Sequence, residues 1–218
     1  MSAKYFILFV QLIALVKVGA QEVDPDLIHV RNRLDSIKSF KADIMMDVDI
    51  SFINMPTKYG KVSYTRGNGT KITSNDFIML PKRGLDLTME DIFKYPYITV
   101  QRGVQEIGGI RCKVLNIIPT SEKADFSIAT LFLDKLNNRI LKLEVSTKKD
   151  GVYTSFLNYK QKKAILPSSV EVQFEVSNVK IPLRFLGKET KVDKSALKDE
   201  EAKSGKILLQ LTDMNVIL

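Results

Sequence analysis

An unbroken alternation of apolar and polar residues between positions 40 and 52 constrains this chain more than any other feature. Every second position is apolar, in the order Phe40, Ala42, Ile44, Met46, Val48, Ile50 and Phe52. A β-strand has a side-chain period of two, so the run places all of these on one face and the polar residues on the other. The pattern predicts a long antiparallel strand with one face on a core and one in water.

Further segments with strand character follow, separated by turn residues. We expect strands at 58–66, 70–80, 97–106, 110–118, 127–134, 139–148, 152–159, 170–176 and 207–211. Between them lie Gly67-Asn68-Gly69, Gly108-Gly109 and Asn137-Asn138, and Gly and Asn tolerate the positive φ of tight hairpins. About nine or ten antiparallel strands twist and curl toward a barrel, so we expect one mainly β (α+β) domain with an apolar interior.

Two helices are expected beside the strands. Asp24 is a good N-cap and Pro25 suits the first helical position, so a helix should start there and end at Ser39. An apolar stripe recurs along it at helical spacing: Leu27, Val30, Leu34 and Ile37. A short second helix at 88–93 is expected to begin with a capping box, from Thr88 to Asp91. Both helices are candidates to cover the apolar face of the sheet.

The first 20 residues have the order of a secretory signal. Lys4 provides a basic start, an apolar run covers 5–16, and the small-residue exit is Val18-Gly19-Ala20. The run is shorter than the roughly 20 apolar residues that span a bilayer. We therefore expect cleavage after residue 20, export to the periplasm, and a soluble mature domain at 21–218.

Charge and cysteine content limit the kinds of partner and the disulfide bonds that we expect. Removing 1–20 lowers the formal charge from +8 to +6, and the basic residues are scattered, which favours solubility over nucleic-acid binding. The stretch 188–206 is mostly charged and predicts a solvated, mobile insertion. Cys112 is the only cysteine and lies in an apolar alternation, so we expect a small buried hydrophobe and no internal disulfide.

Residues that carry catalysis are scarce. His29 is the only histidine, so a nucleophilic triad would have to include it, and an ordinary helix histidine is the preferred interpretation. One His and one Cys far apart do not make a zinc site, and no metal or cofactor is expected. Asp43, Asp47 and Asp49 share one strand face, where a solvated polar surface is preferred over a cation site. A binding protein is favoured over an enzyme.

Short motifs in a consistent order resemble the periplasmic lipoprotein carrier (LolA) family. These are the helix-to-strand step Ser39-Phe40-Lys41-Ala42, a second strand ending in Arg66, the hairpin from Leu133-Asp134-Lys135 to Arg139-Ile140-Leu141, and Leu166-Pro167 before an alternating strand. The family's pattern has Pro after the arginine, where this chain has Gly67. The resemblance implies an unclosed half-barrel sheet capped by helices around an apolar cavity. It also implies a non-enzymatic carrier that shields the acyl chains of a lipoprotein, or a lipid, on the way to the outer membrane.

The resemblance also implies a candidate site. The candidate acyl-chain lining is Phe40, Ile44, Met46, Val48, Ile50, Phe52, Val62, Tyr64, Val170, Val172, Phe174 and Val176, and Arg66 is the candidate that holds the lid by hydrogen bonding. A solid core without a cavity would show the same alternation, so both interpretations stay open. The implied partners are lipoproteins or lipids, bound through their acyl chains, and transient envelope proteins, with the chain itself a monomer.

Two other functions fit parts of the pattern. A regulatory or sensing module could use the same fold to bind an acylated ligand or a protein partner. An outer-membrane barrel would also show alternating strands, but the leading helix, the charged insertion and the lack of aromatic girdles argue against it. The carrier is the main hypothesis.

Overall fold

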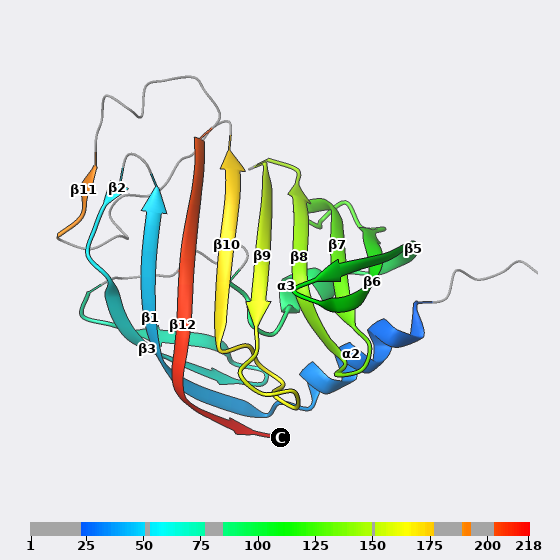
Figure 1. Ribbon diagram of the computed structural model, residues 1–218, viewed down its shortest axis with the longest axis horizontal. Helices are drawn as coiled ribbons and strands as arrows, with labels where there is room; N and C mark the ends of the chain where they lie inside the picture. The colour runs from blue at the N-terminus through cyan, green and yellow to red at the C-terminus, as the bar shows by residue number, and fades with distance from the viewer. Residues whose placement is uncertain (1–22, 51–52, 77–84, 150, 177–188, 193–202) are drawn as a thin grey trace, which may run out of the picture.

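The computed structural model describes residues 23–50, 53–76, 85–149, 151–176, 189–192 and 203–218. Over these ranges it contains one antiparallel sheet and two helices, α2 (Pro25–Asp35) and α3 (Glu90–Phe93) (Figure 1). The strands are β1 (Ser39–Ile50), β2 (Ile53–Asn54), β3 (Lys58–Thr65), β4 (Gly69–Thr73), β5 (Tyr97–Ile107), β6 (Ile110–Pro119), β7 (Phe126–Asp134), β8 (Arg139–Thr147), β9 (Val152–Asn158), β10 (Ser169–Val176), β11 (Lys191–Val192) and β12 (Lys203–Ile217). The expected signal at 1–20, Phe52 and much of the expected insertion at 188–206 lie outside the described ranges.

The sheet curls without closing. Its order is β11-β2-β1-β12-β10-β9-β8-β7-β6-β5, and β3 pairs with β1 while β4 pairs with β3. Among the described strands, β5 pairs only with β6, so that edge does not meet the β3–β4 edge. The expected unclosed half-barrel is confirmed, with twelve strands of which two are only two residues long. None of the helices in the described ranges is long and apolar enough to cross a membrane.

The alternation in β1 sets the register of its neighbours. Met46 pairs with Leu209 of β12, and Phe40 pairs with Tyr64 of β3. The rings of Phe40 and Tyr64 stack with their centroids 5.4 Å apart, a separation typical of favourable aromatic pairs. A slip of one residue would turn every apolar side chain of β1 toward water, so the pattern fixes the pairing.

Helix α2 begins as predicted and ends earlier. The Asp24 carboxylate accepts a hydrogen bond from the Asp26 N–H at 3.0 Å, and Pro25 follows in the first turn. The last helical residue is Asp35 and not Ser39, because the Ser36 hydroxyl donates to the Arg33 carbonyl at 2.7 Å and closes the final turn. Ser39 is instead the first residue of β1.

The expected capping box of the second helix is wrong. The N-cap of α3 is Met89, which has φ of 57° and makes no side-chain cap. Asp86 supplies the acceptors instead, binding the Thr88 N–H at 3.0 Å and the Asp91 N–H at 3.1 Å. An aspartate two residues before Thr88 competes for the same backbone donors, and here it binds them.

Cys112 lies in a second, smaller cluster on the other face of the sheet. It is fully buried against Val114, Phe132 and Leu141. Burial raises the pKa of the Cys112 thiol, so the group stays protonated and unreactive near neutral pH. The prediction of a small buried hydrophobe is confirmed.

Candidate functional site: an apolar interior under anchored helices

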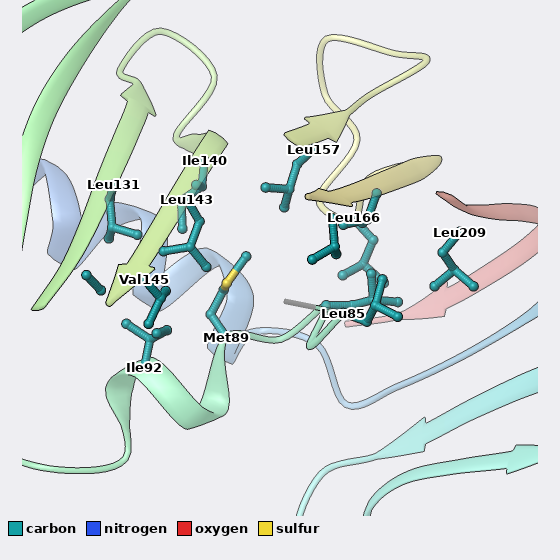
Figure 2. Packing of buried hydrophobic residues seen from close by; sticks show 14 of the residues in the cluster. Leu85, Met89, Ile92, Leu131, Ile140, Leu143, Val145, Leu157, Leu166 and Leu209 are labelled. Carbon is teal, nitrogen blue, oxygen red and sulfur yellow. The ribbon is translucent and has the colours of Figure 1, made fainter. Parts of the chain in front are cut away.

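The concave face of the sheet and the inner sides of both helices form one apolar cluster. Figure 2 shows Leu131, Leu143 and Val145 on the sheet with Met89 and Ile92 facing them. All five are at most 5% exposed. The sheet and the segment containing α3 therefore form a continuous apolar interior.

The structure brings the predicted lining residues together on this face. Phe40, Ile44, Met46, Val62, Tyr64, Val170 and Val172 are buried in the cluster, and Val48 and Phe174 are partly buried against it. Ile50 is 5% exposed at the end of β1. Val176 is the last residue of β10, and Phe52 falls outside the described ranges.

Sequence reasoning missed the other half of this interior. The residues it did not include comprise, among others, Leu85, Leu87, Met89, Ile92, Leu131, Leu133, Ile140, Leu143, Val145, Leu157 and Leu166. A period-two signal was present in Ala129, Leu131 and Leu133, which are all fully buried. Leu85, Leu87 and Met89 also alternate with polar residues, but they belong to neither a strand nor a long helix, so the alternation alone did not show which face they cover.

The cavities that the described residues line between sheet and helices are small. A cavity of about 30 Å³ lies beside Met89, Ile92 and Val145, and one of about 10 Å³ lies beside Leu34 and Met89. The larger holds about one water molecule. An open pocket of about 600 Å³ is lined chiefly by side chains that alternate with the core residues, including Asp49 and Gln173, and Phe174 is the predicted lining residue that borders it.

A half-buried ion triad anchors the N-terminal end of α2. The Lys113 Nζ on β6 lies 2.7 Å from Asp24 Oδ2 and 2.7 Å from Asp26 Oδ2. The hydrogen bond to Lys113 lowers the pKa of Asp26 below its ordinary 3.8, against an opposing effect of burial. For Lys113, desolvation lowers the pKa, but hydrogen bonds to Asp24 and Asp26 outweigh it and raise the net value.

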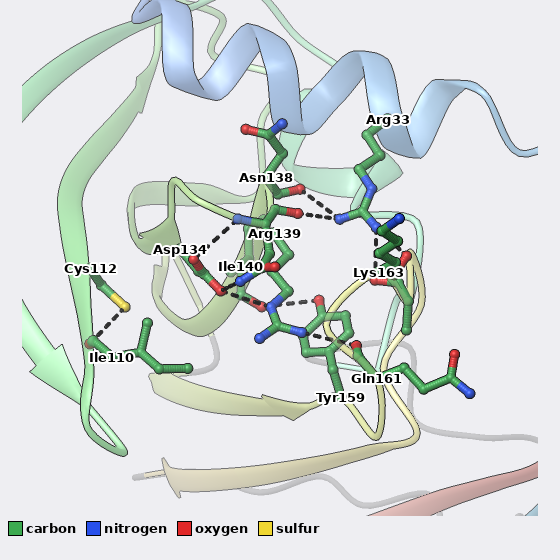
Figure 3. A network of polar contacts seen from close by, with 12 residues as sticks. Arg33, Ile110, Cys112, Asp134, Asn138, Arg139, Ile140, Tyr159, Gln161 and Lys163 are labelled. Atoms are coloured by element: carbon green, nitrogen blue, oxygen red, sulfur yellow. Dashed lines mark hydrogen bonds and ion pairs between the residues drawn. The ribbon is translucent and has the colours of Figure 1, made fainter.

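Arg33 anchors the other end of α2 to two loops. Its guanidinium donates to the carbonyls of Asn137 and Asn138 in the β7–β8 turn and to those of Lys163, at 2.5 Å, and Ala164, at 3.1 Å, after β9 (Figure 3). Four carbonyls from two loops share one cation, which is a geometry that the planar fork of arginine permits and lysine does not.

A second arginine fixes the turn that Arg33 binds. Arg139 Nε lies 2.9 Å from Asp134 Oδ2, and the Asp134 side chain is 1% exposed. The Arg139 guanidinium also lies over the Tyr159 ring, 4.7 Å from its centroid, and the Tyr159 hydroxyl donates to the Ile140 carbonyl at 3.0 Å. Burial raises the pKa of Tyr159. This network makes the β7–β8 turn a rigid partner for the helix.

Arg66 lies at the junction of α2 and β1. Its side chain donates to the Ile37 carbonyl at 2.8 Å, and its N–H donates to the Lys38 carbonyl at 2.9 Å. α3 has a separate attachment, a hydrogen bond of 2.8 Å from the Tyr64 hydroxyl to Glu90 Oε1. Burial, with a further contribution from Glu90, raises the pKa of Tyr64 to about 12, so this donor persists across physiological pH.

The polar candidates have ordinary partners. His29 is exposed on α2. Asp43 pairs with Lys61 at 3.2 Å, and Asp49 pairs with Lys206 at 3.4 Å. Asp47 accepts from the Thr57 hydroxyl at 2.5 Å. The three carboxylates thus have three different partners, as expected of a polar strand face.

Fold and site together define a class: an open antiparallel half-barrel whose apolar concave face is covered by anchored helices. Solved structures with this architecture are known. A DUF1329 family protein from Desulfovibrio piger is 11% identical to this chain, with a TM-score of 0.51 over 88% of this chain and 92% of its own. An outer membrane lipoprotein-sorting protein domain from Vibrio parahaemolyticus is 15% identical, with a TM-score of 0.51 over 87% and 91%.

A LolA superfamily protein from Nitrosomonas europaea is 12% identical, with a TM-score of 0.47 over 88% of this chain and 94% of its own. No family model matches the sequence, and no curated protein matches it closely enough to be counted a relative. The likeness is one of fold, and the expected LolA-like fold is confirmed.

Proposed function

We propose that this protein is a non-enzymatic periplasmic carrier that shields the acyl chains of a lipoprotein, or of a lipid, beneath its helices. The observation that carries the proposal is the continuous apolar surface shared by the concave sheet and the α3 segment. Moving an acyl chain from a membrane into water costs about 0.8 kcal/mol per CH₂, and an apolar lining of this extent can offset much of that cost. The fold likeness to a lipoprotein-sorting domain supports the same function.

Uptake of an acyl chain requires part of the cover to move, because the cavities of about 30 and 10 Å³ are far too small for one. α2 is fixed at both ends, by Lys113 and by Arg33 and Arg66. α3 has only four residues, its N-cap Met89 makes no side-chain cap, and a hydrogen bond between Tyr64 and Glu90 links it to the sheet. We infer that α3 is displaced when cargo enters, while α2 stays in place.

A fluorescent fatty-acid probe tests the proposal. The delipidated mature protein should bind the probe, and a long-chain acyl ligand should displace it. Met89→Glu places a carboxylate beside both small cavities and should weaken probe binding at least tenfold, since a buried charge disfavours an acyl chain. Val152→Glu, at a position that is 48% exposed on the other face, is the matched control and should bind normally.

The thermal midpoint of each variant must be measured beside the affinity. Absence of probe binding by the folded parent would contradict the carrier. Capture of acylated envelope proteins by the mature protein would separate lipoprotein from free lipid as the cargo.

A further inference from the structure

Two loops that meet at Arg33 of α2 carry exposed lysines and one exposed leucine. Lys160, Lys162 and Lys163 are exposed on the loop that follows β9. In the turn between β7 and β8, Leu136 is 94% exposed and the Lys135 side chain is 55% exposed. These five residues are called the basic corner below.

The corner is built on a fixed backbone. Arg33 holds the β7–β8 turn through the Asn137 carbonyl and the β9–β10 loop through the Lys163 carbonyl, so the two loops lie side by side (Figure 3). Arg139 holds the Gln161 carbonyl at 3.3 Å. The loops are therefore preorganised, and a ligand would have to order only the lysine side chains.

The positive charge of the corner is largely uncompensated. Lys135 lies 3.4 Å from Asp26, which Lys113 already binds. Within the part of the chain that the structure describes, no carboxylate lies within ion-pair distance of Lys160, Lys162 or Lys163. Lys160, Lys162 and Lys163 are close together in sequence, and the fold brings the loop that carries Lys135 beside them.

We propose that the basic corner docks reversibly on an anionic membrane surface. The lysines bind headgroup phosphates, and Leu136 enters the boundary between headgroups and acyl chains. One protruding apolar side chain among flexible cations suits a fluid headgroup layer. A specific protein interface has a well-packed centre, often aromatic, and Leu136 alone does not provide one. This surface is separate from the interior, so the proposal stands independently of the carrier function.

Vesicle co-sedimentation tests whether the lysines of the basic corner bind an anionic membrane. Each lysine near an anionic surface contributes about 1 kcal/mol, or roughly fivefold in binding, so Lys160→Gln/Lys162→Gln/Lys163→Gln should lower binding to vesicles with about one third phosphatidylglycerol by roughly 100-fold. The control removes the same charge from exposed positions outside the corner, Lys71→Gln/Lys123→Gln/Lys149→Gln. It should lower binding only a few fold. Equal losses in both variants would overturn the proposal.

Fluorescence tests whether the side chain at position 136 enters the membrane. The chain contains no tryptophan, so Leu136→Trp introduces a single reporter at a position where the fold tolerates change. Its emission should shift to the blue with phosphatidylglycerol vesicles and stay unchanged with pure phosphatidylcholine. Val152→Trp, exposed elsewhere on the sheet, should not shift. No shift for Leu136→Trp, or binding of an acidic protein without binding of vesicles, would overturn membrane docking.

Discussion

At the scale of single residues, Arg33 contributes most to holding α2 in place against the sheet. It lies on α2 between Val30 and Leu34 of the apolar stripe, and its importance comes from four carbonyls that belong to residues more than 100 positions away. A sequence pattern cannot indicate such partners, because each is a backbone group. Only the curl of the sheet brings them to one side chain.

We expect Arg33→Met to lower the free energy of unfolding by about 2–3 kcal/mol, because partly buried carbonyls lose a charged donor. Arg31→Met is the matched control, since Arg31 is 46% exposed and makes only an ion pair of 3.6 Å with Asp35 and a contact of 5.9 Å with the Phe93 ring centroid. Its effect should stay within about 0.5 kcal/mol. Urea unfolding measures both, and equal effects would refute the anchoring role of Arg33.

Gly205 is the second residue with a specific steric role. It pairs with Ile50 on one side and Phe174 on the other, and a Cβ there would lie 2.7 Å from Ile50 Cγ1 and 2.8 Å from Phe174 Cζ. Gly205→Ala should therefore destabilise the protein by about 1–3 kcal/mol. Adding Phe174→Leu should recover part of the loss in thermal unfolding. Additive effects in the double mutant would show that the ring is not the obstacle.

At the scale of elements, the anchoring of α2 should depend on pH. The lowered pKa of Asp26 means that its contribution to stability is complete well above the unfolded-state value of 3.8 and is lost as pH falls through the lower folded-state pKa. The raised pKa of Lys113 gives the opposite limit, with its contribution lost as pH rises above 10.5. The stability difference between the parent and Asp26→Asn should thus vanish in acid, and a constant difference from pH 6 to pH 2 would contradict the triad's role.

The α3 segment should control the rate of uptake. Tyr64→Phe removes the hydroxyl that binds Glu90 and keeps the ring stacked on Phe40. A neutral-to-charged hydrogen bond contributes about 1.5 kcal/mol, so fatty-acid probe uptake should quicken by up to about tenfold. Tyr59→Phe, at a residue that is 58% exposed, is the control. Stopped-flow fluorescence measures both rates. An unchanged rate of uptake in Tyr64→Phe would show that α3 is not the element that moves.

Arg66 provides a comparison with Tyr64. Arg66→Leu removes the hydrogen bond to the Ile37 carbonyl and loosens the junction of α2 and β1. We expect it to shift cargo uptake or release, although less than Tyr64→Phe if α3 is the moving element. A larger effect for Arg66→Leu would favour α2 as the gate.

The elements themselves were largely predictable, because each depends on local periodicity and turn chemistry. The β5–β6 hairpin turns at Gly108 and Gly109, both with positive φ, as the glycine pair predicted. The end of α2 and the cap of α3 were mispredicted, since side chains two or three residues away decided them. The burial of Leu85 and Met89 could not be predicted from the sequence, because it depends on a sheet formed by other segments.

At the scale of the whole molecule, the apolar interior of the half-barrel has to meet two opposing requirements. The interior is filled by its own side chains when no cargo is bound, and the same side chains must accept an acyl chain when one arrives. Met46 and Met89 are both buried in this interior, and unbranched, polarisable side chains of this kind adapt to changed surroundings. A carrier that must later release its cargo benefits from such adaptable walls.

Native mass spectrometry of the mature protein, purified without detergent from the envelope of the expressing cell, tests the central claim most directly. Acyl-chain cargo in the interior predicts a mass above that of the polypeptide by one lipid or lipoprotein, lost on delipidation and restored by adding a long-chain acyl ligand. The Met89→Glu variant should show less of the bound species than Val152→Glu. A spectrum with only the bare polypeptide, before and after addition of the ligand, would contradict the carrier function.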